Sequence, residues 1–171
     1  MMDLAKKIRD VPDFPKKGIL FKDITTLLQD PEALRAAVKV FVDRYKDQKV
    51  DVVVAVESRG FIFGGAVAVA LGAGFVPVRK PGKLPSATFQ ETYELEYGTD
   101  TIEIHQDAIG PGQRVLVLDD LLATGGTVAA VVRLLSKFDC EIMGVAFLIE
   151  LDFLAGREKL AGQDIYTAIH F

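Results

Sequence analysis

The sequence of 171 residues contains no tryptophan, one cysteine and two histidines. Cys140 has no partner for an internal disulfide, and its place in the apolar run CEIMGVAFLI favours a small core residue over a nucleophile. His105 and His170 are isolated and do not show the spacing of metal ligands, so we expect a structural or surface role for each. These absences direct attention away from cysteine and histidine chemistry.

An excess of positive charge is also absent, as is any long hydrophobic segment. The chain has 20 Lys and Arg residues against 24 Asp and Glu residues, a net charge of −4, which gives no reason to expect a nucleic-acid surface. No apolar run reaches membrane-spanning length, and the N-terminus lacks the core of a signal peptide. We therefore expect a cytoplasmic protein with a single domain over residues 1–171 and with neither membrane nor nucleic-acid partners.

Short apolar runs alternate with helical patterns along most of the chain. Unbroken Val/Leu/Ile runs bounded by turn residues are typical of strands that are buried on both faces. Asp30-Pro31 has the cap-then-proline order of a helix start, and short helices are also expected over residues 2–9 and in FLAGREKL. This alternation predicts an α/β fold with a parallel sheet wound by right-handed crossovers. The predicted strands lie in DVVVAVES, GAGFVPVRK, VLVL, CEIMGVAFLIEL and QDIYTAIHF.

Two segments interrupt this rhythm. Residues 81–101 begin with Pro, Gly and Pro and then alternate polar and apolar residues, which predicts a mobile loop flanked by a two-stranded antiparallel ribbon. Residues 11–25, VPDFPKKGILFKDIT, hold too many prolines for a helix and too many large apolar residues for a plain surface loop. We expect the first segment to be a lid, and the second either a lid over a site or an arm that covers the core.

The stretch VLVLDDLLATGGTV, residues 115–128, carries the strongest functional pattern. A buried strand runs into a short loop that contains Gly125 and Gly126, and a helical pattern follows at once. Such a loop offers free N–H groups and the positive end of a helix dipole to an anion. Thr124 and Thr127 add hydroxyl donors. The loop therefore favours a phosphate, although TGGT as a simple turn is the structural alternative.

Two adjacent acids, Asp119 and Asp120, indicate which kind of phosphate compound the loop binds. Beside a phosphate they would repel the ligand unless they accept hydrogen bonds from ribose hydroxyls or help to hold a divalent cation, and the structural alternative is that they merely end a strand. The loop has neither the GxxxxGK[ST] nor the GxGxxG spacing, which argues against a triphosphate P-loop and a dinucleotide fold. Arg59, at a second strand–helix junction, is suited to grip another anion, but an ordinary surface arginine is the alternative.

This ordered combination resembles the phosphoribosyl-pyrophosphate (PRPP) signature of the type I phosphoribosyltransferases. The collinear segments VPDFPKKGILFKDIT, ESRGFIFG, VRKPGKLP, YELEYG and ELDFLAGREKL resemble the adenine phosphoribosyltransferase branch over nearly the whole chain. The resemblance implies transfer of the 5-phosphoribosyl group from PRPP to adenine, giving AMP and pyrophosphate with Mg²⁺. It also implies an open, mainly parallel five-stranded sheet flanked by helices, a hood at about 11–28, a flexible catalytic loop at about 81–101, and a homodimer.

Site residues follow from the same resemblance, motif by motif. The ribose hydroxyls and water bound to the metal are assigned to Asp119 and Asp120. The 5-phosphate is assigned to Ala123, Thr124, Gly125, Gly126 and Thr127. Pyrophosphate is assigned to Ser58, Arg59, Arg79 and Lys83, with Arg79 reaching across the dimer. The adenine site is assigned to Leu20, Phe21 and Lys22, and the catalytic pair is Glu96 and Tyr97. A cis bond is implied between Glu57 and Arg59.

Lys22 departs from the family pattern, because many relatives carry arginine there. The change should matter little if adenine is read through the backbone, whereas it casts doubt on reading through the side chain. Two other functions share parts of the pattern. A 6-oxopurine transferase usually takes a lysine from a late loop, which QDIYTAIHF does not offer. A PRPP-binding regulator would lack the catalytic lid or add a DNA-binding domain.

Overall fold

The computed structural model describes residues 2–94 and 98–171. Its centre is a sheet of five strands in the order β4-β3-β7-β8-β9, and every neighbouring pair runs parallel. The bounds of these strands are Val52–Val56 for β3, Gly74–Val78 for β4, Gln113–Leu122 for β7, Cys140–Glu150 for β8 and Ile165–His170 for β9. The α/β fold and the strands expected from the apolar runs are confirmed.

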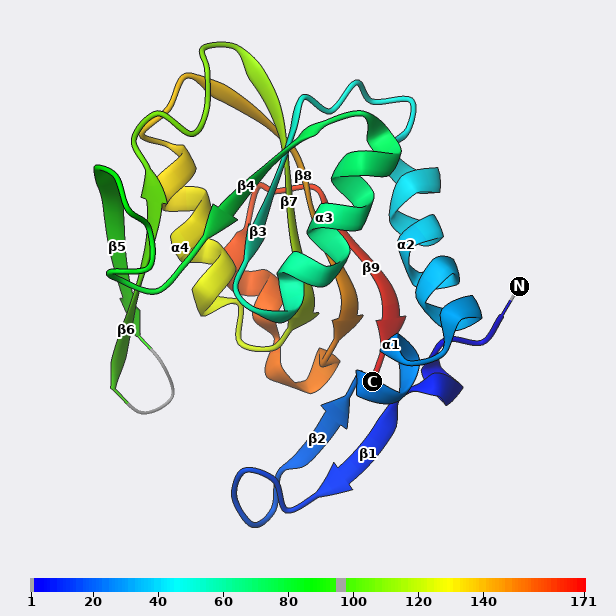
Figure 1. Ribbon diagram of the computed structural model, residues 1–171. Coiled ribbons are helices and arrows are strands. Elements are labelled where there is room, and N and C mark those ends of the chain that lie inside the picture. Colours follow the sequence, from blue (N-terminus) through cyan, green and yellow to red (C-terminus); the bar gives the residue numbers. More distant parts are fainter. Residues whose placement is uncertain (1, 95–97) are drawn as a thin grey trace.

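Helices cover both faces of this sheet (Figure 1). Their bounds are Thr25–Leu28 for α1, Pro31–Tyr45 for α2, Arg59–Leu71 for α3 and Gly126–Leu135 for α4. Successive strand residues point to opposite faces, so Val117 packs with α4 while Leu116 and Leu118 pack with α1, α2 and α3. Because both faces are buried, the strands read as continuous apolar runs rather than as an alternating pattern.

Helix α2 begins as its sequence predicts. The Oδ1 atom of Asp30 accepts hydrogen bonds from the backbone N–H groups of Glu32, at 2.9 Å, and Ala33, at 3.2 Å. Pro31 occupies the first helical position, where its missing N–H would have no partner in any case. The cap therefore satisfies two of the N–H groups that a helix start leaves free.

Two antiparallel ribbons extend from this core. The expected ribbon within the loop segment is confirmed, with β5 at Thr88–Glu94 and β6 at Thr99–His105. The N-terminal segment contains a hairpin that the sequence analysis did not predict, with β1 at Arg9–Pro12 and β2 at Leu20–Asp23. The helix predicted for residues 2–9 was wrong, because a 3₁₀ turn, η1 (Ala5–Lys7), is followed at once by a strand that pairs Arg9 with Asp23.

The FLAGREKL segment also differs from its prediction. Two short 3₁₀ helices, η2 (Asp152–Leu154) and η3 (Gly156–Leu160), replace the single short helix. Ala155, which separates them, has a left-handed backbone with φ of 50°, and a right-handed helix cannot continue through that conformation. The break turns η3 back toward the loop between β7 and α4, against which it packs.

The two ribbons reach the same edge of the sheet. In Figure 1 the arrowheads of β7, β8 and β9, the β1–β2 hairpin and the Glu94–Thr99 end of the β5–β6 ribbon all lie in the lower part of the molecule. This is the carboxyl edge, where open α/β sheets bind ligands. Among the described residues, none of the helices combines the length and the apolar character needed to cross a membrane.

Tyr45 provides a test of the core. Its side chain is fully buried, its hydroxyl faces Gly144, and that oxygen has no hydrogen-bond partner among the described residues. Burial raises the pKa of this hydroxyl to about 12. We predict that Tyr45→Phe increases the free energy of unfolding by about 1 kcal/mol, because it removes a buried polar atom that lacks a partner. Urea denaturation measures the change.

Tyr166→Phe is the matched control for this experiment. The Tyr166 ring packs edge-to-face against the Tyr45 ring with 6.3 Å between centroids, and that side chain is only partly buried. Its substitution should leave stability nearly unchanged. A clear loss of stability in Tyr45→Phe would show that the hydroxyl has a partner, such as a buried water molecule.

Candidate active site

The acid pair lies in the last part of β7, at the carboxyl edge of the sheet. The Asp120 side chain is only 7% exposed, and the backbone N–H of Asp120 donates to Asp119 Oδ1 at 2.8 Å. Burial, and then the charge of Asp120, raise the pKa of Asp119 well above its usual value. Burial also raises the pKa of Asp120, although the charge of Arg59 opposes that shift. Two crowded carboxylates are thus held where a cation or hydroxyl donors would stabilise them.

Arg59 connects this pair to the N-terminal hairpin. It is the first residue of α3, and its Nε lies 2.8 Å from Asp120 Oδ2. Its guanidinium also lies 5.5 Å from the centre of the Phe21 ring. A Cβ on Gly60 would lie 2.8 Å from Asp119 Oδ1, so glycine allows α3 to start directly against the acids. The expected cis peptide bond lies between Glu57 and Ser58.

The two aromatic rings of the hairpin lie on the side of β2 that faces Arg59. Phe21 packs edge-to-face against Phe14 with 5.1 Å between ring centroids, while Leu20 is 48% exposed. Lys22, the next residue of the strand, points the other way. Its Nζ lies 2.7 Å from Asp10 and 3.8 Å from the centre of the Phe171 ring. The Lys22 side chain is therefore engaged away from Phe21 and Arg59.

A basic segment, residues 79–83, follows β4 on the other side of the acids. Arg79 Nε lies 2.8 Å from Glu57 Oε2, and the Lys80 backbone N–H donates to Glu57 Oε1 at 2.7 Å. Although burial acts to raise the pKa of Glu57, these contacts and the charge of nearby Lys83 hold it below its usual value. The Lys80 side chain forms an ion pair with Asp100 of β6, whereas Lys83 is exposed.

The phosphate loop, residues 123–127, forms a small cavity of about 80 Å³ at the start of α4. Thr127 Oγ1 donates to the Tyr93 hydroxyl at 3.2 Å, and that hydroxyl donates to Asp100 at 3.3 Å. The phosphate loop, the β5–β6 ribbon and Lys80 are therefore joined by one chain of contacts. This arrangement places the predicted phosphate site and the predicted lid side by side.

A larger cavity of about 560 Å³ lies between these elements. It brings together five of the residues predicted for the site: Ser58, Arg59, Asp119, Asp120 and Thr127. Arg79 adjoins it through Glu57, and Phe21 through Arg59, whereas Lys83, Leu20 and Lys22 do not line it. The predicted catalytic pair, Glu96 and Tyr97, lies outside the described residues.

The sequence analysis missed three residues that line this cavity, Lys80, Tyr93 and Asp100, and a fourth, Glu103, beside the basic segment. These three have signals in retrospect, because Lys80 lies within the motif VRKPGKLP, Tyr93 begins the motif YELEYG and Asp100 follows it closely. Glu103 had none, since an acid in an alternating strand looks like a solvent-facing residue. It is only 2% exposed and accepts hydrogen bonds from four groups: the backbone N–H groups of Gly82 and Leu84 and the side chains of Thr88 and Gln90. Glu103 thereby fixes the basic segment to the ribbon.

Comparison with known proteins identifies the family. The phosphoribosyl transferase domain family matches residues 23–165. An adenine phosphoribosyltransferase from Acaryochloris marina is 59% identical over 170 residues, which cover 99% of this chain and 100% of that relative.

Two solved structures show the same similarity. The crystal structure of adenine phosphoribosyltransferase from Thermoanaerobacter pseudethanolicus matches with a TM-score of 0.95 and 51% identity, covering 99% of this chain and 98% of that one. The enzyme from Saccharomyces cerevisiae, complexed with adenine and D-2,5-dideoxy-2,5-imino-altritol 1,6-bisphosphate, matches with a TM-score of 0.90 and 41% identity, over 97% and 96% of the two chains. The chain therefore belongs to the adenine phosphoribosyltransferases, a branch of the phosphoribosyl transferase domain family.

Proposed function

We propose that this protein transfers the 5-phosphoribosyl group of PRPP to adenine and releases AMP and pyrophosphate, as in purine salvage. The observation that carries the proposal is the position of Arg59, which contacts Asp120 on one side and the Phe21 ring on the other. The carboxylate that would bind ribose, that of Asp120, and the ring that would cover a flat base, that of Phe21, are thus separated by the Arg59 side chain. The relative from Saccharomyces cerevisiae, which is complexed with adenine, supports the choice of base.

The sugar phosphate would be held by two parts of the β7–α4 connection. The phosphate loop residues Ala123, Thr124, Gly125, Gly126 and Thr127 would bind the 5-phosphate through N–H and hydroxyl groups at the start of α4. Asp119 and Asp120 would accept hydrogen bonds from the ribose hydroxyls. Both contacts hold the anomeric carbon still while the base approaches, which is catalysis by positioning.

The acid pair also fits a magnesium ion. Carboxylate oxygens and water are the ligands that Mg²⁺ prefers, and a cation would offset the burial and mutual repulsion that raise the pKa values of Asp119 and Asp120. We infer that the two aspartates hold Mg²⁺ through water. When bound, this ion would neutralise part of the pyrophosphate charge.

The departing pyrophosphate would be stabilised by the cations on the opposite side of the cavity. The ribosyl ring gains positive charge in the transition state while the leaving group gains negative charge. Arg59, with Ser58 at the start of α3, would meet that charge, and Lys83 would join it from the exposed end of the basic segment, whereas Arg79 would reach the site of the neighbouring subunit. Lys80 lines the same cavity and adds a further positive charge.

Adenine would enter under the hood, the segment at about 11–28. Phe21 would cover the flat base, while Leu20 and the backbone of Lys22 would contact its edge, since the Lys22 side chain is occupied by Asp10 and Phe171. By the family resemblance, Glu96 would exchange a proton with N7 of adenine and so raise the nucleophilicity of N9, with Tyr97 beside it. The loop at about 81–101 would exclude water that could otherwise hydrolyse PRPP.

We further propose a cytoplasmic homodimer of single-domain subunits, each spanning residues 1–171. Three apolar side chains on α3 and at β4 are exposed, namely Ile62 at 42%, Val69 at 83% and Phe75 at 38%. These side chains suit a surface covered by a second subunit. Arg79 follows β4 directly, so a subunit docked at this edge would bring its arginine close to the neighbouring site.

The first test is a direct assay of base specificity. The purified protein is mixed with PRPP and Mg²⁺ and offered adenine, hypoxanthine, guanine or xanthine separately. We predict that AMP is the single nucleotide formed, because the hood would contact the base through backbone groups and not through a lysine side chain. Product from an oxopurine would overturn the base assignment, and PRPP binding without any product would favour a regulatory protein.

A second prediction concerns Glu96→Gln. The amide cannot exchange the proton, so kcat should fall by about 10²-fold or more while the affinity for PRPP stays nearly constant. Single-turnover kinetics measure the chemical step, and calorimetric titration measures PRPP binding. The assignment fails if the variant turns over like wild type when chemistry limits the rate. Glu91→Gln, in the described part of the ribbon, is the control because Glu91 is paired with Arg133 of α4.

A third prediction links function to stability through Asp119→Asn. The pKa of an unfolded aspartate is about 3.9, and the folded value is raised. The wild type should therefore lose stability as the pH rises above about 4, until the pH exceeds the folded pKa. We expect Asp119→Asn to lose most activity yet to melt at a higher temperature than wild type at pH 8. That advantage should shrink toward pH 4, and equal melting curves at both pH values would contradict it. Asp47→Asn, at an exposed position, is the control.

A further inference from the structure

The phosphate loop packs against η3, a segment to which no function has been assigned so far. The loop and η3 touch through their backbones, at Gly125 and Gly156. A Cβ on Gly125 would lie 2.3 Å from the Gly156 carbonyl oxygen, and a Cβ on Gly156 would lie 2.2 Å from the Ala123 carbonyl oxygen. Neither position has room for a side chain, so the position of η3 sets the position of the loop.

Arg157, the residue after Gly156, fixes this segment to the sheet. Its Nε and Nη2 atoms donate to the two carboxylate oxygens of Glu150, each at 2.7 Å. Nη2 also donates to Thr167 Oγ1 at 2.9 Å. Glu150 is the last residue of β8, and its side chain is 6% exposed. A bidentate pair with a buried carboxylate is geometrically specific, and it ties η3 to the carboxyl ends of β8 and β9.

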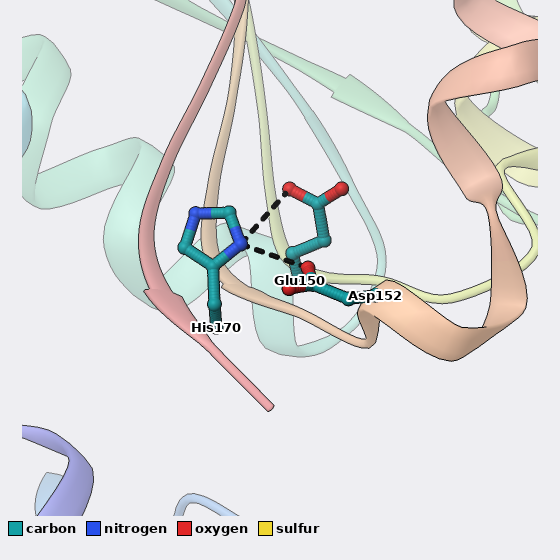
Figure 2. A group of neighbouring side chains, drawn as sticks. All are labelled: Glu150, Asp152 and His170. Atoms are coloured by element: carbon teal, nitrogen blue, oxygen red, sulfur yellow. Dashed lines mark hydrogen bonds and ion pairs between the residues drawn. The ribbon is translucent and has the colours of Figure 1, made fainter.

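Two further side chains complete this anchor, as Figure 2 shows. His170 Nδ1 lies 2.8 Å from Asp152 Oδ1 and 3.7 Å from Glu150 Oε2, while its Nε2 lies 2.8 Å from Thr167 Oγ1. Glu150, Asp152 and His170 are close enough together to share a metal ion. Arg157, however, already supplies the positive charge that Glu150 requires. The cluster is therefore better explained as a structural anchor than as a cation site.

We propose that Glu150 and Arg157 are positioning residues for the 5-phosphate site, because they hold Gly156 against Gly125 and so fix the direction of the N–H groups in the phosphate loop. The proposal rests on the function proposed above. Neither side chain lines the cavity at the acid pair or the cavity at the loop. Their effect on ligands must therefore pass through the loop backbone.

This route makes the expected effect selective. Ligands that carry a 5-phosphate depend on the loop, whereas pyrophosphate depends on Arg59, Arg79 and the basic segment, none of which contacts the anchor. A general loss of protein stability would lower the affinity for both kinds of ligand. If the phosphate loop alone is displaced, only the affinity for ribose 5-phosphate should fall. Small displacements of binding groups are costly when the geometry must be held closely.

The experiment compares Arg157→Ala, Arg157→Lys and Glu150→Gln with wild type. Arg114→Ala is the matched control, since Arg114 of β7 and Glu141 of β8 form a 3.6 Å pair near the amino ends of these strands, at the opposite edge of the sheet from the phosphate loop. Calorimetric titration with ribose 5-phosphate and, separately, with pyrophosphate gives the two affinities for each protein. Melting temperature and the KM for PRPP are measured alongside.

We expect Arg157→Ala to bind ribose 5-phosphate about tenfold more weakly, with pyrophosphate binding changed less than about twofold. Arg157→Lys and Glu150→Gln should show smaller losses of the same kind, and they carry the test if Arg157→Ala does not fold. Arg114→Ala should bind both ligands like wild type. The KM for PRPP should rise in the anchor variants more than kcat falls.

Two results would overturn the proposal. One is that the anchor variants bind ribose 5-phosphate with the affinity of the wild type. The other is that their affinities for ribose 5-phosphate and pyrophosphate fall equally while the melting temperature also falls. Failure of the proposed function would be distinguishable, because the wild-type protein itself would then form no AMP from PRPP and adenine, whatever its affinity for ribose 5-phosphate.

Discussion

Repulsion between two neighbouring carboxylates is the constraint around which the site is organised. Asp119 and Asp120 meet at the end of a buried strand, where burial and mutual charge make ionisation costly. In the described structure Arg59 offsets part of this cost from the start of α3. Ligands would offset the remaining cost of ionisation, since in the proposed reaction they bring hydroxyl donors and a metal ion. The site thus gives up stability in order to bind a charged sugar, a common exchange at functional sites.

The sheet and the two ribbons have different parts in this arrangement. The sheet fixes the acids and the phosphate loop at its carboxyl edge, as expected for an open α/β fold. The β1–β2 hairpin brings Phe21 to Arg59, and the β5–β6 ribbon brings Tyr93 to Thr127. Glu103 holds the base of that ribbon to the basic segment. The groups proposed to bind the base, the sugar phosphate and the leaving group thereby come together from distant parts of the chain.

The sequence predicted the sheet, the β5–β6 ribbon and the acid pair, because buried strands, turn residues and phosphate loops leave local patterns. It did not predict the β1–β2 hairpin, whose short strands are separated by a loop that contains Pro15 and are stabilised by pairs such as Arg9 with Asp23. Glu103 and the contact of Gly156 with Gly125 were also missed. Their roles depend on partners far along the chain, and no local period records such contacts.

The alternation of side chains along β2 separates two roles on the two faces of one short strand. Phe21 faces Arg59, while Lys22 faces Asp10 and Phe171 on the opposite side. The side chain of Lys22 therefore satisfies an acid and an aromatic ring, which in the proposed site leaves contact with adenine to its backbone. In the proposed site, a substitution on the Phe21 face of β2 would therefore alter base binding directly, whereas one of the Lys22 side chain would first disturb the contacts with Asp10 and Phe171.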